Sequence, residues 1–418
     1  MQFIYTITTS LIAFLITIFA KNSFVALSPA RIFTYFWTFQ IIFMVFLWHD
    51  YLLFSYTGLL YILLCIFSFD IGAIIVSNQK TSTIPLTKRV YYNEKYVNAI
   101  YIAVLGVSVF GTINGILVKG FSLQTLMNLD SFLEMSNQNS IDRYSGEEEA
   151  GGVIGKIIAI NDYACPLVGG MLFFYFKKKI YSVLSLVPLF FNGLAQGVKM
   201  GIITGSFMWL IGIIISMQIF DIRLKLKMKH IILSIIIGLS FFLLLIISMM
   251  FRIGRFDWDT FETASTKFIS YSLGHLPAFD MWFDKMDSES LDYTFGGKLF
   301  YGITNYLGIL ERKQGVFTEM YVISKGGDST NVFTVFRLII EDFGIFFTIP
   351  FMFIMGVITH KIYQYFLKKK NLALGVALMS AIYFFISWSF VTSVFAYTTY
   401  IVMFFYLYII CKFLFKKE

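Results

Sequence analysis

Long apolar stretches, separated by short polar ones, recur along the whole chain. A helix that crosses a bilayer needs about 20 apolar residues, and eleven stretches approach or reach that length. They cover residues 3–20, 31–49, 54–77, 97–118, 153–176, 180–196, 201–220, 230–250, 338–362, 371–389 and 395–414. The pattern predicts an all-α polytopic membrane protein with about 11 transmembrane helices, in which residues 1–418 form a single integral membrane domain.

The composition agrees with this pattern. Of 418 residues, 58% are hydrophobic and 14% are charged, whereas a soluble domain carries about 25% charged residues. The net charge of +8 is explained first by cytoplasmic Lys and Arg, so it does not call for a nucleic-acid partner. Cys65, Cys165 and Cys411 have no paired spacing, and we expect no disulfide framework, metal or other cofactor.

Clusters of Lys and Arg predict the orientation of the chain. With 11 spans, all of these clusters fall on one side of the membrane, which the positive-inside rule assigns to the cytoplasm. They lie at 80–95, 177–179, 223–229, 368–370 and 416–417. The N-terminus is then outside and the C-terminus is cytoplasmic.

Two long segments, 119–152 and 251–337, fall on the opposite face. Both mix acidic and basic residues, and 251–337 is rich in Trp, Tyr and Phe. Disordered segments lack such aromatic residues, and long connections are commonly functional. We therefore expect 251–337 to fold, in part into short helices at the membrane surface, and the function to lie on this external face.

Charged residues inside or beside the predicted spans need a reason to be there. Asp70 and Asp162 lie deep in spans, where a charge costs at least about 2.5–3.5 kcal/mol, so each should face a partner or a cavity. On the external side, Arg252 and Arg255 stand three apart and would share one face of a helix. Their guanidinium groups suit either lipid headgroups at the interface or a lipid-linked phosphate. The external basic residues as a set are Arg143, Lys199, Arg252, Arg255, Arg312, Lys313 and Arg337.

The stretch STNVFTVFRLIIEDFGIF carries three ionisable residues where the last long loop enters a span. If it is helical, Thr334, Arg337 and Glu341 lie on one face, and an Arg337–Glu341 ion pair is the simplest structural interpretation. Asp342 is turned about 100° from Glu341, so it need not share that role. His275 is the one histidine in a long external loop, where it could accept a proton near pH 7 or be structural.

Three stretches carry a resemblance to a known family: LGHLPAFDMWF, TFGGKLFYGI and TNVFTVFRLIIEDFGIF. The chain resembles the bacterial oligosaccharide repeat-unit polymerases, the Wzy-type O-antigen polymerases. The matching positions within about 270–345 are Asn331, Thr334, Asp342, Phe343 and Gly344. The turn AQGVKMG, with Lys199, also fits. Some members carry Arg-x10-Gly and His-x10-Gly patterns, and neither Arg143 nor His275 has that spacing.

The resemblance implies a glycosyltransferase at the outer face of the bacterial plasma (inner) membrane. Its donor would be a glycan on undecaprenyl diphosphate and its acceptor a lipid-linked repeat unit. Its product would be O-antigen or a capsular or exopolysaccharide. The implied fold is of the C type of membrane glycosyltransferase, with 251–337 folded over the active-site cavity. A chain-length regulator and a flippase are the implied partners in the membrane.

The residues available could supply this chemistry without a metal. External cations would stabilise the leaving diphosphate, and a carboxylate or histidine would accept a proton. As catalytic residues we predict Arg337, Asp342, His275 and Arg255. As residues that bind diphosphate or sugar we predict Arg252, Lys199, Arg143, Arg312, Asn331, Thr334 and Asp280.

Other classes of protein remain open. An O-antigen ligase, or another glycosyltransferase that uses lipid-linked sugars, has a similar architecture but a different acceptor. A flippase or transporter for lipid-linked oligosaccharides is a second alternative, although transporters commonly show internal repeats and none is seen here. A passive structural membrane protein would not account for the clustered external arginines.

Overall fold

The computed structural model describes residues 2–77, 90–145, 152–222, 228–287, 291–311 and 317–417. The chain divides into two compact units. Unit 1 comprises Met1–Thr87 and Ile269–Phe404, and unit 2 comprises Lys88–Phe268 and Phe405–Glu418. Two of the three boundaries between the units lie within helices, α11 (Trp258–Leu273) and α16 (Thr398–Leu414), and the third falls outside the described residues.

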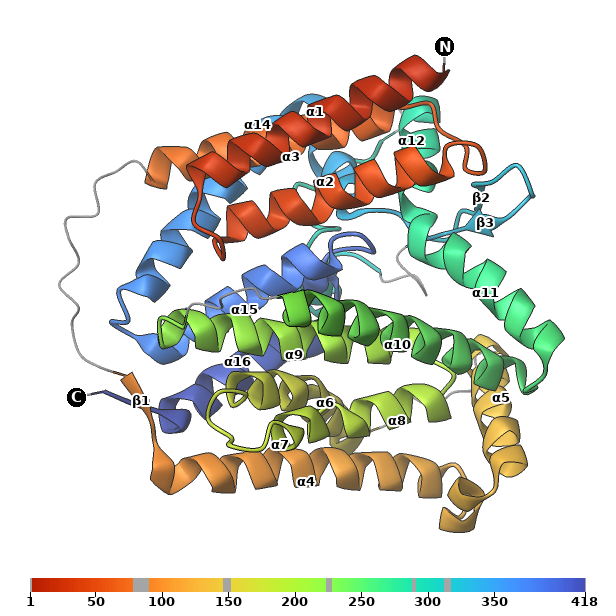
Figure 1. The fold of residues 1–418 in the computed structure, drawn as a ribbon, viewed down its shortest axis with the longest axis vertical. Helices are drawn as coiled ribbons and strands as arrows, with labels where there is room; N and C mark the ends of the chain where they lie inside the picture. The colour runs from red at the N-terminus through yellow and green to blue at the C-terminus, as the bar shows by residue number, and fades with distance from the viewer. Residues whose placement is uncertain are drawn as a thin grey trace. The chain divides into compact units, whose positions relative to one another are not determined.

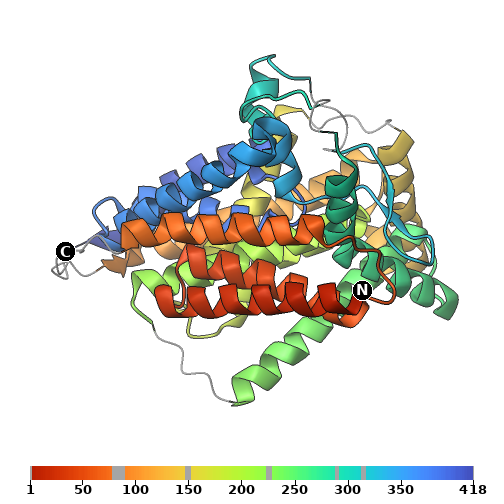
Figure 2. The same cartoon turned by 90° about the horizontal axis from the view of Figure 1, so that it is seen from above.

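Unit 1 is built on long helices that pack side by side. α1, α2 and α3 run next to one another in both views (Figure 1, Figure 2), and α14 lies along α3. Glycines allow that close approach, because a Cβ on Gly72 would come within 2.0 Å of the Phe353 carbonyl oxygen, and one on Gly356 equally close to that of Phe69. The elements are α1 (Gln2–Ser23), α2 (Pro29–Trp48), α3 (Thr57–Ser77), α12 (His275–Lys285), α13 (Tyr301–Tyr306), β2 (Tyr321–Val322), β3 (Ser329–Thr330), α14 (Val335–Leu367), α15 (Leu372–Trp388) and η3 (Val394–Ala396).

Unit 2 is also helical, with α6 packed along α9. Here again glycines bring the backbones together, since a Cβ on Gly170 would meet the Trp209 carbonyl oxygen at 2.0 Å. A short antiparallel pair joins β1 to β4, with Tyr91 opposite Lys416. The elements are β1 (Val90–Tyr92), α4 (Glu94–Val118), η1 (Leu123–Met127), α5 (Leu129–Ser145), α6 (Val153–Met171), α7 (Ile180–Leu184), α8 (Val187–Ala195), α9 (Lys199–Ile219), α10 (Met228–Ile253) and β4 (Phe415–Lys417).

Each of the eleven predicted stretches is largely helical, although helix α6 ends at Met171 within 153–176, and 180–196 divides into the short helices α7 and α8. Within the described residues, six helices are long and apolar enough to cross a membrane: α1, α2, α3, α4, α9 and α14. A seventh span results if the end of α10 and the start of α11, bent by 115°, count as one. The described chain is thus predominantly helical, with several helices that could cross a membrane, while 11 spans and their orientation stay predictions.

Both long segments that were predicted to be external contain helices. Segment 251–337 holds α11, α12 and α13 together with the β2–β3 hairpin, and segment 119–152 holds η1 and α5. The short helices expected in 251–337 are present. Their place at a membrane surface stays a prediction.

The two deep aspartates are buried. Asp70 on α3 is 0% exposed, and its carboxylate accepts a hydrogen bond from the Thr34 hydroxyl, with Oγ1 lying 2.9 and 2.8 Å from the two oxygens. It therefore has a structural partner, as predicted. Asp162 on α6 is 5% exposed.

α14 is broken near its start by Gly344, whose φ of 77° and ψ of 168° are not helical. A positive φ of this kind suits glycine, because a Cβ would clash with the backbone. Residues 335–342 before the break are all buried. Directly after it, the apolar side chains of Phe346 and Phe347 are 85% and 72% exposed. The charged residues of this stretch therefore belong to the packed interior of unit 1.

Candidate functional site

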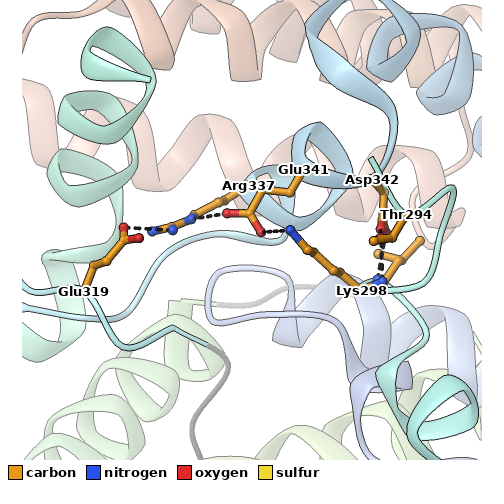
Figure 3. A network of polar contacts seen from close by, with 7 residues as sticks. Thr294, Lys298, Glu319, Arg337, Glu341 and Asp342 are labelled. Atoms are coloured by element: carbon orange, nitrogen blue, oxygen red, sulfur yellow. Dashed lines mark hydrogen bonds and ion pairs between the residues drawn. The ribbon is translucent and has the colours of Figure 1, made fainter. Parts of the chain in front are cut away.

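A chain of alternating charges lies at the start of α14 (Figure 3). Arg337 Nε donates to Glu341 Oε1 at 2.7 Å, and Arg337 Nη2 donates to Glu319 Oε2 at 2.9 Å. Lys298 Nζ lies 3.2 Å from the other oxygen of Glu341, Oε2. The Arg337–Glu341 pair predicted from the helical spacing is confirmed. Lys298 and Glu319, which come from loops, extend it into a network of two cations and two carboxylates.

Aromatic rings surround the Arg337 guanidinium. Its central carbon lies 4.9 Å from the ring centroid of Trp282, 4.5 Å from that of Phe317 and 4.3 Å from that of Phe333. Arg337 is only 5% exposed, so its charge interacts with ring faces and carboxylates rather than with water. Its Nη1 has no hydrogen-bond partner among the described residues. The guanidinium therefore retains an unused donor next to Nη2.

The two glutamates on Arg337 differ in their access to solvent. The Glu341 side chain is 11% exposed, whereas the Glu319 side chain is 57% exposed. A buried charge-assisted hydrogen bond is strong, and an exposed one contributes about 0–1 kcal/mol. Glu341 thus fixes the orientation of Arg337, while Glu319 is the partner that another anion can replace at low cost.

Asp342 holds the loop that carries Lys298. Its Oδ1 accepts from the Lys298 backbone N–H at 3.0 Å and from the Thr294 hydroxyl, and its Oδ2 accepts from the Leu299 N–H at 2.8 Å. Its carbonyl oxygen also accepts from the Phe295 N–H at 3.1 Å. Asp342 is 0% exposed. Because it clamps the backbone of residues 294–299, it places Lys298 beside Glu341.

Asp280 performs a similar task for another segment. Its Oδ2 accepts from the N–H groups of Ser55 and Tyr56 at 2.6 and 2.8 Å, and its Oδ1 from those of Gly58 and Leu59 at 2.8 and 3.2 Å. It thereby caps the N-terminus of α3 from α12. Burial raises the pKa of the Asp280 carboxyl, and these N–H donors act against that rise. The carboxylate is 0% exposed and is occupied by α3.

His275 begins α12 and is 0% exposed. Its ring lies edge-on to Trp37 and Phe390, with centroids 6.3 and 5.4 Å away. Burial lowers the pKa of His275 to about 3, and the Ser272 carbonyl opposes this only in part. The imidazole is therefore neutral near pH 7 and does not reach solvent.

Two further predicted residues of unit 1, Thr334 and Asn331, lie close to Arg337. Thr334 occupies the N-cap position of α14 and is 0% exposed. The Asn331 amide donates to the Phe317 carbonyl at 3.2 Å, so it fixes part of the aromatic enclosure. Arg312 lies outside the described residues.

Unit 2 holds a second set of predicted residues. Lys199 begins α9, and the charges of Arg252 and Lys267 act on it. The prediction that Arg252 and Arg255 share a helical face is wrong, because α10 ends at Ile253 and Gly254 follows with a φ of +78°. Arg255 is exposed beyond that end. Arg143 lies in α5, and its side chain is outside the described part of the structure.

The structure therefore divides the predicted residues between the units. Unit 1 gathers Asn331, Thr334 and Arg337 with Glu341, and it places Asp342 behind them. Sequence reasoning missed five contributors to this site: Trp282, Lys298, Phe317, Glu319 and Phe333. Lys298 lies in the TFGGKLFYGI stretch that carries part of the resemblance, whereas no pattern around Glu319 distinguishes it. Among the described residues, no group of three or more His, Cys, Asp or Glu could hold a metal ion.

Comparisons of the chain with protein-family models, with curated proteins and with solved structures found no match.

Proposed function

We propose that this protein is a membrane glycosyltransferase that polymerises undecaprenyl-diphosphate-linked oligosaccharide repeat units at the outer face of the plasma membrane. Two lines support the proposal. The first is the resemblance to the Wzy-type polymerases within 270–345. The second is that residues of those same stretches, Lys298, Arg337 and Asp342, meet in one network. The observation that carries it is the enclosed Arg337, held by one buried carboxylate and one exposed carboxylate.

The site suits a leaving diphosphate. In the proposed reaction an acceptor hydroxyl oxygen bonds to the anomeric carbon of the donor sugar, and the bond from that carbon to the diphosphate oxygen breaks. The lipid diphosphate leaves with the electron pair and gains negative charge. Arg337 and Lys298 stabilise that charge, and an enclosure poor in water strengthens the effect. Diphosphate oxygens replace Glu319 on Nη2, because a planar guanidinium binds phosphate through paired donors.

The proton of the acceptor hydroxyl needs an acceptor at the same site. His275 and Asp342 are both fully buried, and the Asp342 carboxylate is engaged by the loop at 294–299. Glu319 is the exposed carboxylate beside Arg337. We therefore assign proton acceptance to Glu319 once the diphosphate has displaced it, and we assign positioning of the Lys298 loop to Asp342.

The test is the length of the glycan made by the bacterium that carries the gene. Deletion should leave glycan with a single repeat unit, and the wild-type gene should restore the ladder. Arg337→Gln should give the deletion result at unchanged protein level in the membrane, because it removes the charge and keeps a hydrogen-bonding side chain. Lys21→Gln, at an exposed end of α1, is the matched control and should leave the ladder unchanged.

Two outcomes would overturn the proposal. A ladder of unchanged length in the deletion strain would exclude a polymerase. A full-length polymer that accumulates on its lipid carrier without transfer to the core would identify a ligase instead.

A further inference from the structure

A pocket of about 500 Å³ lies in unit 1, apart from the Arg337 network. Its walls come from the start of α1, the segment before α3, the end of α12 and the turn between β2 and β3. The lining residues used below are Tyr5, Phe54, Tyr56, Asp284, Lys285 and Lys325. This volume is within the range of sites for small molecules, about 300–1,000 Å³.

One wall of the pocket is aromatic. The rings of Tyr5 and Tyr56 are stacked, with centroids 5.8 Å apart and planes at 22°, and Phe54 lies 5.7 Å from Tyr56. Tyr56 is 2% exposed and Tyr5 is 47% exposed. Such a wall offers a flat apolar surface on which the C–H face of a sugar ring can stack.

Tyr56 is held in place by strong constraints. Its φ of 72° is unusual for a residue with a side chain. The backbone N–H donates to the Asp280 carboxylate at 2.8 Å, and the hydroxyl lies 2.8 Å from the Thr6 hydroxyl. Backbone strain of this kind persists only where the surrounding structure over-determines it. The Tyr56 ring, against which Tyr5 stacks, is therefore held in a fixed position.

Three further lining residues are charged, and together they carry more positive than negative charge. Asp284, Lys285 and Lys325 are all exposed, which gives two cations against one carboxylate. The turn with Lys325 is tied to the chain before α3, because Lys325 N–H donates to the Tyr51 carbonyl at 3.0 Å and Leu53 N–H donates to the Ile323 carbonyl at 2.9 Å. Within the described residues, neither lysine forms an ion pair. Lys285 Nζ lies over the Tyr321 ring, 5.8 Å from its centroid, and this contact leaves the ammonium able to pair with an anionic group as well.

α12 connects this pocket to the Arg337 site. Trp282 packs against the Arg337 guanidinium, while Asp284 and Lys285, two and three residues later, line the pocket. α12 therefore contributes residues to both sites.

We propose that this pocket binds a sugar residue that carries a carboxylate, such as a uronic acid. The ring stacks on Tyr5, the two lysines pair with the carboxylate, and Asp284 accepts hydrogen bonds from hydroxyl groups. The choice of a sugar as the ligand class rests on the proposed function. The pocket is then a specificity subsite for the repeat unit and has no part in bond cleavage.

The experiment measures binding of glucuronate to the purified full-length protein in nanodiscs by saturation-transfer NMR. Glucose is the neutral control and acetate is the control for charge alone. Glucuronate should bind at least about tenfold more tightly than either. Tyr5→Ala should weaken glucuronate about tenfold, which corresponds to loss of one stacking contact. The double variant Lys285→Ala and Lys325→Ala should remove the preference over glucose.

Matched variants separate this proposal from general effects. Phe3→Ala removes another exposed ring from α1, and Lys21→Ala removes another exposed lysine; both should bind glucuronate as the wild type does. Arg337→Gln should also bind glucuronate normally, although it should abolish chain extension. That pair of results distinguishes failure of the pocket from failure of the polymerase proposal.

Three results would overturn the proposal. One is equal binding of glucuronate and glucose, and another is equal binding of glucuronate and acetate. The third is loss of binding in Arg337→Gln with normal binding in Tyr5→Ala, which would place the sugar at the Arg337 site instead.

Discussion

Asp280 and Asp342 are both buried aspartates that hold the backbone of a distant segment, yet the two regions they build differ. The Asp280 carboxylate accepts hydrogen bonds from N–H groups at the N-terminus of a long helix, α3. Asp342 holds an irregular loop, and that loop carries Lys298 into a charged network. In the first region the partners of the carboxylate are mainly backbone N–H groups. The second combines hydrogen bonds to a loop backbone with charged side chains beside that loop.

The comparison shows that the same arrangement, a buried carboxylate that accepts several hydrogen bonds from a distant segment, can have two different consequences. A carboxylate that accepts several N–H groups fixes a backbone wherever it occurs. Whether stability or activity depends on the carboxylate is decided by the groups that the fixed backbone carries. At Asp280 it presents the start of a helix and the Tyr56 ring, so loss should be felt first in stability. At Asp342 it presents a lysine beside Glu341, so loss should be felt first in activity.

Asp280→Ala should have the largest effect on stability. It leaves four N–H groups of the α3 N-terminus without their acceptor, and buried unsatisfied donors cost about 1–3 kcal/mol each, so a total loss of about 3 kcal/mol or more is expected. Thermal unfolding in detergent measures this. Asp284→Asn, one turn later on α12 and exposed, is the control and should leave the unfolding temperature unchanged.

Asp342→Ala should destabilise less and should impair chain extension more. The clamped loop is short and irregular, so we expect a loss of about 1–3 kcal/mol in stability. Glycan length should nevertheless fall to that of Arg337→Gln, because Lys298 no longer has a fixed position. Thr294→Val removes only the side-chain hydrogen bond and should give an intermediate ladder. Equal loss of stability in Asp280→Ala and Asp342→Ala would remove the contrast between the two regions.

The stability of the protein should decrease as the pH is lowered, because of His275, which lies on the same helix as Asp280. The pKa of the folded-state histidine is lowered to about 3, whereas an unfolded histidine has a pKa of about 6.5. Between these values the unfolded chain binds a proton that the folded chain excludes. The contribution is fully present above about pH 6.5, and as the pH falls below that value stability is lost at about 1.4 kcal/mol per pH unit.

His275→Phe supplies the comparison. It keeps an aromatic ring against Trp37 and Phe390 and cannot take up a proton. When the pH is lowered from 7.5 to 5, the unfolding temperature of the wild type should therefore fall more than that of the variant. Parallel curves would show that His275 does not control this dependence.

Glu319→Gln should have the smallest effect on stability, within about 0.5 kcal/mol, because the Glu319 side chain is 57% exposed and Arg337 keeps its buried partner Glu341. Its effect on turnover should be large by contrast. Loss of a general base lowers the rate by about 10²–10⁴-fold. Initial rates of chain extension on purified lipid-linked repeat units measure this. Unchanged turnover would leave Glu319 as a counter-ion of Arg337 without a part in proton transfer.

Helical periodicity predicted contacts correctly where the two residues lie close together in the sequence. The spacing of Arg337 and Glu341 predicted their ion pair, and the angle between Glu341 and Asp342 indicated that the two acids need not share a role. The structure agrees with both, since Glu341 holds Arg337 and Asp342 holds the loop. The apolar stretches likewise predicted helices, because hydrophobic length and composition are properties of the segment itself.

Contacts between segments far apart in the sequence could not be predicted from periodicity. Asp280 and Gly58 are more than 220 residues apart, so nothing near Asp280 indicates that it caps α3. Glu319 reaches Arg337 from a loop, and its neighbours carry no periodic signal. The shared face of Arg252 and Arg255 failed for a local reason, because Gly254 adopts a positive φ and ends the helix between them.

The break at Gly344 also bears on how this protein would respond to bilayer thickness. A continuous α14 of 33 residues would be about 50 Å long, against a hydrocarbon core of about 30 Å. Residues 345–367 alone are about 35 Å long, which matches a bilayer with modest tilt. Because the chain changes direction at Gly344, hydrophobic mismatch can be taken up by tilting the longer part. Arg337 and its partners would then keep their geometry in membranes of different thickness.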